Sequence, residues 1–410
     1  MKKRLISLVA AAALVGGISI AQAPAAKAGT VTVAGDTQVQ LYGGVKIYTG
    51  WTKQLDSYGN VGNKVWADNA MATDKAVDYQ KLNKTNFQDF SMSSAGTKLG
   101  VNFSNKDANI SGKIEIGLNA GGNYLRHAYI KHSFNNGLYV LLGQTSVPYE
   151  QHSFSIAPNV TAGWNILSSR TPEVMVGGNL DIADSASLDF KFAAFTPGLW
   201  TPNAPDATKK MPAFGLDLGV NFDTGFGAPA RVYAATLVST QKYTYYDNVT
   251  SKYNATNKTS YAYTAGLVLP VSMVTFQTQY QHAKGMSKLA GVKGAGAEGV
   301  APDVYINKNE NGITQSKFDA WNIEAKVAPM PCVSVALGYD YIKFKNLTDQ
   351  PNTYTGFLKK NSAYFINANI KTTKYTTLGL EWQHDSTKYD KQKDSKAKGD
   401  LFYAQYTYSF

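Results

Sequence analysis

Apolar and polar residues alternate along most of this chain, in segments of about ten residues that begin near residue 38. The first segment has apolar residues at Val39, Leu41, Val45 and Ile47 and mostly polar residues between them. Because successive side chains of a strand point to opposite faces, this pattern predicts a strand with one apolar and one polar face. The alternation recurs near 110–119, 188–192, 214–223, 274–281, 321–327 and 378–383.

The predicted connections between these strands are alternately short and long. The short ones lie near 104–108, 135–137, 181–186, 223–229, 270–272, 328–331 and 371–374. The long ones lie near 52–86, 145–168, 197–212, 241–259, 283–317, 345–360 and 385–399. A soluble sandwich also has alternating strands, but regular exchange of short turns and long loops is typical of a transmembrane barrel. One connection, 119–123, is short where a long loop is due.

The expected fold class is therefore all-β: a transmembrane antiparallel β-barrel of about sixteen strands. Unpaired strand edges are costly in lipid, so such a sheet must close on itself. At sixteen strands a barrel is too wide for side chains to fill, so it encloses an aqueous lumen. Eighteen strands stay an open alternative.

The amino terminus has the layout of a secretory signal peptide. Lys2, Lys3 and Arg4 precede an apolar segment at 5–20, and Ala26-Lys27-Ala28 offers a cleavage site. A rival site at 21–23 would place a proline directly after the cut. We expect a cleaved signal peptide at 1–28 and a single barrel domain at 29–410, exported to the cell outer membrane.

Composition fits a barrel better than a bundle of membrane helices. The chain has 26 tyrosines and 36 glycines, 17% charged residues and a mean hydropathy of −0.26. After the signal peptide no apolar run approaches the roughly 18 residues that a membrane helix needs. A barrel keeps a low mean hydropathy because its apolar residues alternate with polar ones.

Charge and cysteine content narrow the partners further. The formal net charge is +11, and removal of Lys2, Lys3, Arg4 and Lys27 leaves +7, enough for a weak anion preference in a pore. The lysines are scattered, which argues against nucleic acid as a partner. The single cysteine, Cys332, allows no internal disulfide, and no motif indicates a metal or another cofactor.

The segment from Phe402 to Phe410 alternates aromatic and mixed residues and stops on phenylalanine. It resembles the closing strand of bacterial outer-membrane β-barrels. That resemblance implies that Tyr406, Tyr408 and Phe410 form a barrel-assembly signal. The implied partners are the barrel-assembly machinery and outer-membrane lipid.

Three further segments resemble the general porins of Gram-negative bacteria: S-S-A-G-T-K-L-G-V-N-F at 93–103, L-R-H-A-Y-I at 125–130 and G-L-Y-V-L-L-G-Q at 137–144. The resemblance implies a homotrimer and a third loop, 145–168, that folds into the lumen and narrows it. It also implies basic wall residues opposite an acid of that loop, here Arg126 and Arg170 opposite Glu150. Gln144 stands where many relatives have arginine, and the short 119–123 connection weakens the trimer expectation.

Other charged residues fall on the polar faces of predicted strands, and we expect them on the lumen wall. They are Lys46, Lys113, Glu115, Asp189, Lys191, Asp217, Glu324, Lys326, Asp340 and Glu381. Both signs are present, so any preference for anions should be weak.

The function that these observations favour is a porin for passive diffusion of small hydrophilic solutes and ions, without catalysis. A substrate-specific channel is one alternative, and an adhesive or structural envelope barrel is another. A surface hydrolase would need a nucleophile and a base, and His152-Ser153 is a poor pair because adjacent side chains of an extended segment point apart.

Overall fold

The computed structural model describes residues 30–33, 37–56, 88–94, 96–119, 122–156, 170–196, 207–209, 211–247, 249–286, 304–307, 312–345, 358–389 and 396–410. The predicted signal peptide at 1–28 lies outside the described residues, as do most of the predicted connection at 52–86 and residues 157–169 of the third loop.

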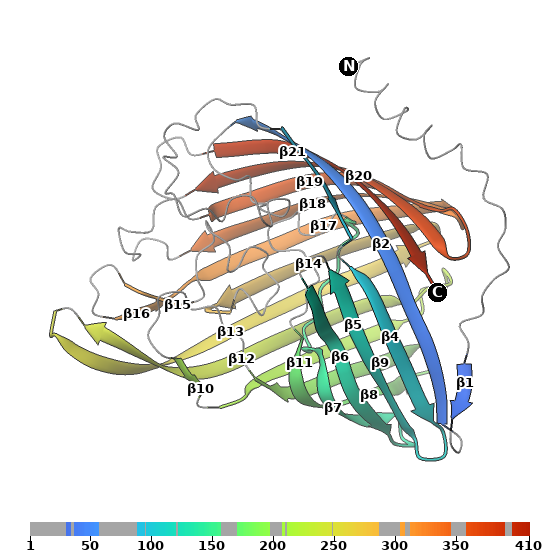
Figure 1. The fold of residues 1–410 in the computed structure, drawn as a ribbon, viewed down its shortest axis with the longest axis horizontal. Helices are drawn as coiled ribbons and strands as arrows, with labels where there is room; N and C mark the ends of the chain where they lie inside the picture. The colour runs from blue at the N-terminus through green and yellow to red at the C-terminus, as the bar shows by residue number, and fades with distance from the viewer. Residues whose placement is uncertain are drawn as a thin grey trace.

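Sixteen antiparallel strands form a closed barrel (Figure 1), which confirms the predicted fold class and strand number. They are β2 (Thr37–Asp56), an interrupted strand made of β3 (Gln88–Ser93) and β4 (Thr97–Asn105), β5 (Ile110–Asn119), β6 (Gly122–Ser133), β7 (Leu138–Ser146), β8 (Arg170–Ala183), β9 (Ala186–Phe195), β11 (Ala213–Phe222), β12 (Ala230–Asp247), β13 (Lys252–Val271), β14 (Val274–Lys284), β17 (Lys317–Met330), β18 (Val333–Lys345), β19 (Leu358–Lys371), β20 (Thr376–Tyr389) and β21 (Lys396–Ser409).

The first and last strands close the barrel. β2 pairs with β21 from Gly44↔Ser409 to Asp56↔Lys398, and on its other side with β3 and β4. Gly43 and Phe410 extend this seam, because each backbone N–H donates to the other's carbonyl at 3.1 Å. Every barrel strand therefore has two neighbours, as a sheet in lipid requires.

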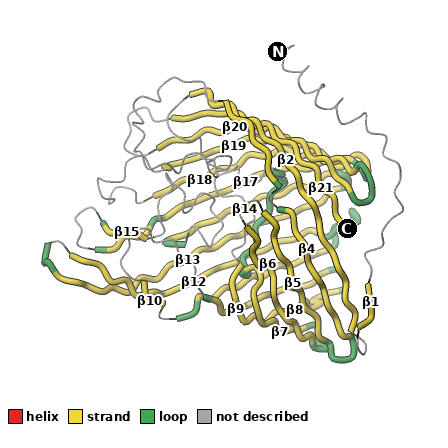
Figure 2. The backbone as a smooth tube through the Cα atoms, in the orientation of Figure 1, coloured by secondary structure: helices red, strands yellow, loops and turns green. Residues whose placement is uncertain are grey.

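Among the described residues, four short strands lie outside the sixteen. β1 (Thr30–Val33) pairs with the start of β2, and β10 (Ala207–Lys209) pairs with β12. Of the strands that the structure describes, β15 (Val304–Ile306) and β16 (Ile313–Gln315) pair only with each other. Figure 2 shows strands and loops throughout the described residues. Within those residues, no helix has the length and apolar character that a membrane crossing would need.

The predicted long connection at 241–259 is wrong. β12 and β13 stay paired from Gln241↔Lys258 to Asp247↔Lys252, so the two strands continue through most of this range. The resulting hairpin projects beyond the neighbouring strands (Figure 1, yellow-green). Tyr243 and Tyr245 on this hairpin are buried in a cluster with Val304 and Ile313 of the β15–β16 pair. Outside a membrane neither face has to be apolar, so the alternation that marks the other strands fades here.

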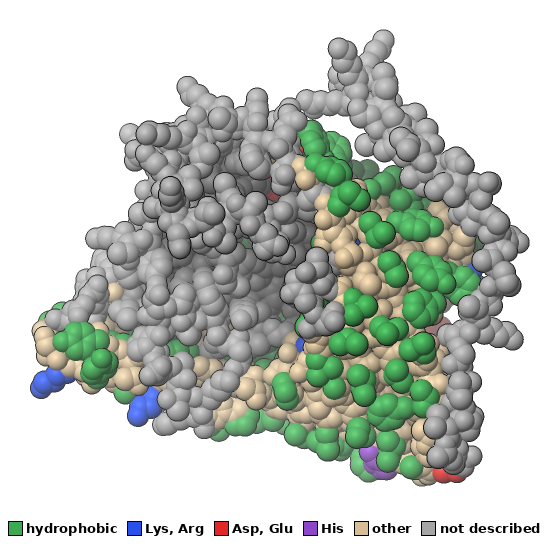
Figure 3. Space-filling view, viewed as in Figure 1, with side chains coloured by type: hydrophobic (Ala, Val, Ile, Leu, Met, Phe, Trp, Pro, Cys, Tyr) green, Lys and Arg blue, Asp and Glu red, His purple; other side chains and the backbone are tan. Residues whose placement is uncertain are grey.

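The alternation of side chains separates an apolar outer face from a polar inner face, as expected. Ile114 is 53% exposed, whereas its neighbour Glu115 is 2% exposed. In β21, Leu401 and Tyr403 are buried on the inner face, whereas Tyr406 and Tyr408 are exposed on the outer face. Figure 3 shows apolar side chains spread over the part of the outer face formed by β2, β4, β5 and β6.

The outer face changes character around the barrel. On β14 to β20 it carries a row of aromatic rings, with centroids 5.1 Å apart for Trp321–Tyr339 and 4.8 Å apart for Tyr339–Tyr364. On β5 to β8 the exposed apolar side chains at mid-height are aliphatic: Ile114, Ile116, Leu125, Ile130, Leu142, Val174 and Val176. Aromatic rings of this kind mark the two interfaces of a lipid bilayer.

Candidate functional site

All ten charged residues expected on the lumen wall lie on the inner face in this structure. Each one alternates along its strand with residues of the outer face. The most deeply buried are Glu115, Asp217, Glu324, Asp340 and Glu381. Others are half-buried beside aromatic rings, such as Lys46 over Tyr48 at 5.8 Å and Lys326 over Phe154 at 4.7 Å from ammonium nitrogen to ring centroid.

The inner face has two charged regions, which we name the basic wall and the acidic wall. The basic wall comprises Lys98, Lys113, Arg126, Lys131, Lys191 and Arg231, on strands β4 to β12. The acidic wall comprises Glu324, Asp340, Glu381 and Asp385, on strands β17 to β20. The basic wall also contains carboxylates, such as Asp217, whose Oδ2 lies 3.3 Å from the Lys191 ammonium.

The segment Val147–Ile156, which follows β7 directly, lies against the inner face of the barrel. Gln281 Nε2 on β14 donates to the Tyr149 hydroxyl at 2.9 Å, and the His152 N–H donates to Gln279 Oε1 at 3.1 Å. Gln279 and Gln281 are buried on the inner face, whereas Tyr280 between them in the sequence points outward. The segment 147–156 therefore extends over the inner face from the end of β7 to β14.

Two carboxylates of the acidic wall hold this segment in the same way. Glu324 accepts hydrogen bonds from Ser153 Oγ at 3.0 Å and from the Phe154 N–H at 2.5 Å. Glu381 accepts from Ser155 Oγ and from the Ile156 N–H, both at 2.7 Å. A carboxylate that accepts backbone N–H bonds forms a strong, charge-assisted contact.

Two asparagines add hydrogen bonds to the same segment: Asn322 lies on β17 with Glu324, and Asn367 lies on β19, next to the strand of Glu381. Asn322 Nδ2 donates to the His152 carbonyl at 3.1 Å, and Asn367 Nδ2 donates to the Phe154 carbonyl at 2.8 Å. Asn322 also donates to Glu324, and Asn367 to Glu381, both at 3.0 Å. The wall thus satisfies both donors and acceptors of an extended backbone, which takes the place of strand pairing.

The segment approaches β20 closely at a glycine. A Cβ atom added to Gly379 would lie 2.7 Å from Ile156 Cδ1. Gly379 is buried on the inner face, two residues before Glu381. A larger residue there would force the Ile156 side chain to shift.

Glu150 pairs with Arg231 of β12 through two parallel hydrogen bonds. Arg231 Nε donates to Oε1 at 2.7 Å, and Nη2 donates to Oε2 at 2.6 Å. His152 Nε2 lies 2.5 Å from the same Oε1. Burial alone raises the pKa of the Glu150 carboxyl, but the hydrogen bonds from His152 and Arg231 outweigh burial and lower its pKa to about 2.

Arg231 is itself fixed from three directions. Its Nη1 donates to Asn221 Oδ1 at 2.8 Å and also to Asp189, and its guanidinium packs over Gly219. A Cβ added to Gly219 would lie 2.1 Å from Nη2, so only glycine leaves room for the guanidinium in this position. The arginine therefore presents a fixed charge to the lumen.

Arg126 and Arg170 lie elsewhere, around Glu115 and His127. The pairing of β5 with β6 shifts register between Glu115 and Ile116, so Arg126 is the extra residue of a β-bulge. Such a bulge re-aims a side chain. Here it turns Arg126 to the inner face, where Nε donates to Glu115 Oε1 at 2.5 Å. Arg170 Nε reaches His127 Nε2 at 3.4 Å.

The structure thus brings together Arg126 and Arg170, and separately Glu150 and Arg231. Sequence reasoning did not select Arg231 as a site residue. Two signals pointed to it. It is one of only three arginines in 29–410, and it lies at the start of a strand whose alternation places it on the inner face.

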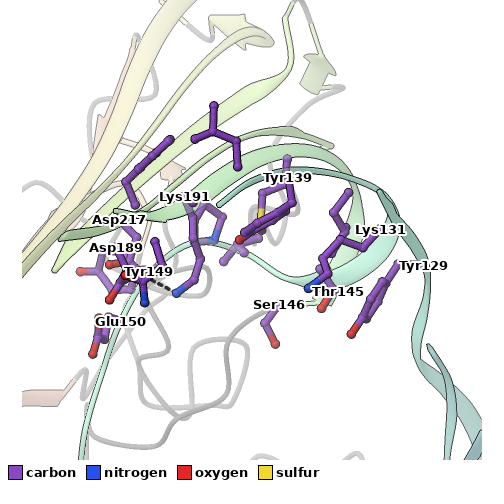
Figure 4. A pocket seen from close by; sticks show the side chains of 18 of the residues that line it. Tyr129, Lys131, Tyr139, Thr145, Ser146, Tyr149, Glu150, Asp189, Lys191 and Asp217 are labelled. Carbon is purple, nitrogen blue, oxygen red and sulfur yellow. Dashed lines mark hydrogen bonds and ion pairs between the residues drawn. The ribbon is translucent and has the colours of Figure 1, made fainter. Parts of the chain in front are cut away.

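A cavity of about 920 Å³ lies between Val147–Gln151 and strands β6 to β12. Figure 4 shows Glu150, Asp189, Lys191 and Asp217 gathered at one side of it, and Tyr129, Lys131 and Tyr139 at the other. Lys131 lies over the Tyr139 ring, 5.2 Å from its centroid. The cavity therefore combines aromatic rings with charges of both signs.

His152 and Ser153 are not arranged as a catalytic pair. The hydrogen bonds of His152 and Ser153 go to different carboxylates, Glu150 and Glu324, so the two side chains are not a nucleophile and its base. Groups of three or more histidine, cysteine, aspartate or glutamate side chains suited to a metal ion do not occur among the described residues.

Comparison with solved structures shows the fold of outer-membrane channels. The outer membrane channel DcaP of Acinetobacter baumannii matches with a TM-score of 0.69 and 19% identity, over 93% of this chain and 99% of that one. The anion-selective porin from Comamonas acidovorans matches with a TM-score of 0.54 and 13% identity, over 91% of this chain and 100% of that one. OmpT of Vibrio cholerae, in its trimer form, matches with a TM-score of 0.53 and 14% identity, over 92% of this chain and 100% of that one. No family model and no curated protein sequence matches this chain.

Proposed function

We propose that this protein is an outer-membrane porin through which small hydrophilic solutes and ions diffuse passively. The observation that carries this proposal is the closed sixteen-strand barrel with an apolar outer face and a charged inner face. A barrel of this width encloses water. The fold similarity to solved outer-membrane channels supports the same function. The proposal involves no reaction and no cofactor.

The third loop narrows the lumen in this proposal. Val147–Ile156 is held against the acidic wall by Glu324 and Glu381, whose charges are taken up by the segment's own donors. The cations of the basic wall face the space that is left, with Arg126, Arg170 and the Glu150–Arg231 pair at its edge. Fixed positive charge at a narrow point favours anions. The carboxylates beside these cations keep that preference weak.

Single-channel recording in a planar bilayer tests this function directly. The refolded barrel should give stable conductance steps, and a salt gradient should give a reversal potential on the anion side. A folded barrel that produces no steps would contradict the proposal. A reversal potential on the cation side would contradict the assigned role of the basic wall.

A substrate-specific channel is the second candidate, and the cavity beside Val147–Gln151 favours it. Tyr129 and Tyr139 offer aromatic contacts, and Lys131 and Lys191 offer charge. A binding site in a channel makes the flux saturate and lets a solute block the ion current at low concentration. Block of the current by millimolar solute would support this candidate, whereas current that rises linearly with salt and resists solutes would support general diffusion.

We infer a homotrimer from the aliphatic part of the outer face. Strands β5, β6 and β7 have 10, 12 and 9 residues, so the wall is low there, and their exposed side chains lack the aromatic row of β14 to β20. An apolar face without interface aromatics suits a protein neighbour better than lipid. Leu142→Lys with Val174→Lys should release monomers in native mass spectrometry, whereas Ile323→Lys on the aromatic side should not.

Export and insertion complete the proposal. A signal peptide at 1–28 would be removed, and Tyr406, Tyr408 and Phe410 would present the last strand to the barrel-assembly machinery. Phe410 seals the seam, since its backbone bonds to Gly43 and its ring lies 5.9 Å from that of Tyr408. Amino-terminal sequencing of protein from outer membranes should give Gly29 first.

A further inference from the structure

Six lysines line the outer face of the barrel on five consecutive strands. We call them the lysine row: Lys284 on β14, Lys317 on β17, Lys343 and Lys345 on β18, Lys360 on β19 and Lys388 on β20. They are direct cross-strand partners in two sets. Lys284 pairs with Lys317 and Lys317 with Lys345, whereas Lys343 pairs with Lys360 and Lys360 with Lys388.

The lysine row sits at a defined height above the aromatic row. On β18 the outer residues run Leu337, Tyr339, Tyr341, Lys343 and Lys345, from the short turn toward the long connection. The other four strands follow the same order, with Tyr280, Trp321, Tyr364 and Trp382 below their lysines. Long connections mark the outside of such barrels. The lysines therefore lie at the headgroup level of the outer leaflet.

Like charges directly opposite each other on neighbouring strands destabilise a sheet. The described carboxylates nearest the row on this face are already engaged. Asp319 accepts hydrogen bonds from the Tyr280 hydroxyl at 2.8 Å and pairs with His282 and Lys345, and Asp400 pairs with His384 at 2.9 Å. Lys343, Lys360 and Lys388 are exposed and adjacent. The row as a whole carries more positive charge than these carboxylates offset.

We propose that the lysine row binds the phosphate groups of phosphorylated glycolipids in the outer leaflet. Lysine stems can lie along the aromatic rings while their ammonium groups reach headgroup phosphates. Several lysines at one membrane surface add their attractions for anionic lipid. The bound phosphates would offset the repulsion within the row, so lipid binding and barrel stability are linked. This inference rests on the proposed outer-membrane location and not on channel activity.

The test uses native mass spectrometry of the detergent-solubilised full barrel with purified lipopolysaccharide, intact or enzymatically dephosphorylated. Lys343→Ser, Lys345→Ser, Lys360→Ser and Lys388→Ser together should weaken binding of the intact lipid by at least roughly tenfold. Binding of the dephosphorylated lipid should be weak and equal in both proteins. A quadruple change to arginine at the same positions should keep the binding.

A matched variant replaces four other exposed lysines with serine. These are Lys106 and Lys374, which lie in turns, and Lys252 and Lys371, which lie at strand ends outside the row. It should bind the intact lipid like the wild type. Equal binding by the row variant, or equal weakening in both variants, would overturn the proposal. Single-channel conductance of the same samples separates the two questions, because the row faces lipid and its loss should leave the conductance unchanged.

Discussion

The basic wall and the acidic wall use charge in different ways. On the basic wall, side chains pair with side chains, as Arg126 does with Glu115 and Arg231 with Asp189. On the acidic wall, Glu324 and Glu381 accept backbone N–H groups of the third loop. The basic wall thus presents its charges to the lumen. The acidic wall uses its carboxylates to hold the third loop in place. Selectivity and loop position should therefore respond to different substitutions.

The largest effect is expected from removing both acidic anchors. Glu324→Ala with Glu381→Ala deletes the acceptors of two backbone N–H groups and two serine hydroxyls. Val147–Ile156 should then leave the wall, and single-channel conductance should change by roughly twofold or more, with added current noise. The measurement is single-channel recording at fixed voltage.

Glu173→Ala is the matched control for that variant. Glu173 is a buried carboxylate on β8, and none of its described neighbours donates a hydrogen bond to it. Its loss should leave the loop and the current unchanged. If the double anchor variant records like this control, the acidic wall does not hold the loop.

Substitution of Arg231 tests the role of the basic wall. Arg231→Gln removes a fixed cation from the edge of the lumen, and the Cl⁻/K⁺ permeability ratio should fall roughly twofold while conductance changes little. Arg231→Lys keeps the charge but loses the two parallel bonds to Glu150, so it should retain most of the anion preference. The reversal potential in a salt gradient measures both variants, and an unchanged ratio for Arg231→Gln would remove this residue from the charge filter.

The Glu150 carboxyl makes the stability of the folded barrel depend on pH. Its pKa is lowered from the ordinary 4.5 to about 2, so the ionised carboxyl contributes stability to the folded state. This contribution is complete above the unfolded value near 4.5 and is lost as pH falls through 2. Denaturant unfolding in micelles should show wild type more stable than Glu150→Gln at pH 7, with the gap closing between pH 4 and pH 2. A gap that stays constant from pH 7 to pH 2 would place the carboxyl outside the Arg231 pair, because an unpaired carboxyl has the same pKa in the folded and unfolded states.

Alternation of side chains was enough to predict the barrel, because lipid outside and water inside impose opposite polarities on neighbouring residues. It also placed Glu324 and Glu381 on the inner face. It could not give their partners, since Ser153 and Ser155 are more than 170 residues away from the carboxylates in sequence. Arg126 points inward because of a bulge, and the β12–β13 hairpin continues where no membrane enforces a pattern. Contacts across the lumen depend on the path of a loop, and a loop has no periodic pattern from which its contacts could be predicted.

The smallest effect is expected from substitution of Gly219, an uncharged residue that contacts the Arg231 guanidinium. Gly219→Ala places a methyl group where the guanidinium lies, so Arg231 must tilt away and lose part of its alignment with Glu150. The permeability ratio should move in the direction of Arg231→Gln but by less. In the Arg231→Gln background the same substitution should add little, because the guanidinium it displaces is gone. Recordings of the two single variants and the double variant form the cycle, and additive shifts would show that Gly219 acts on the pore independently of Arg231.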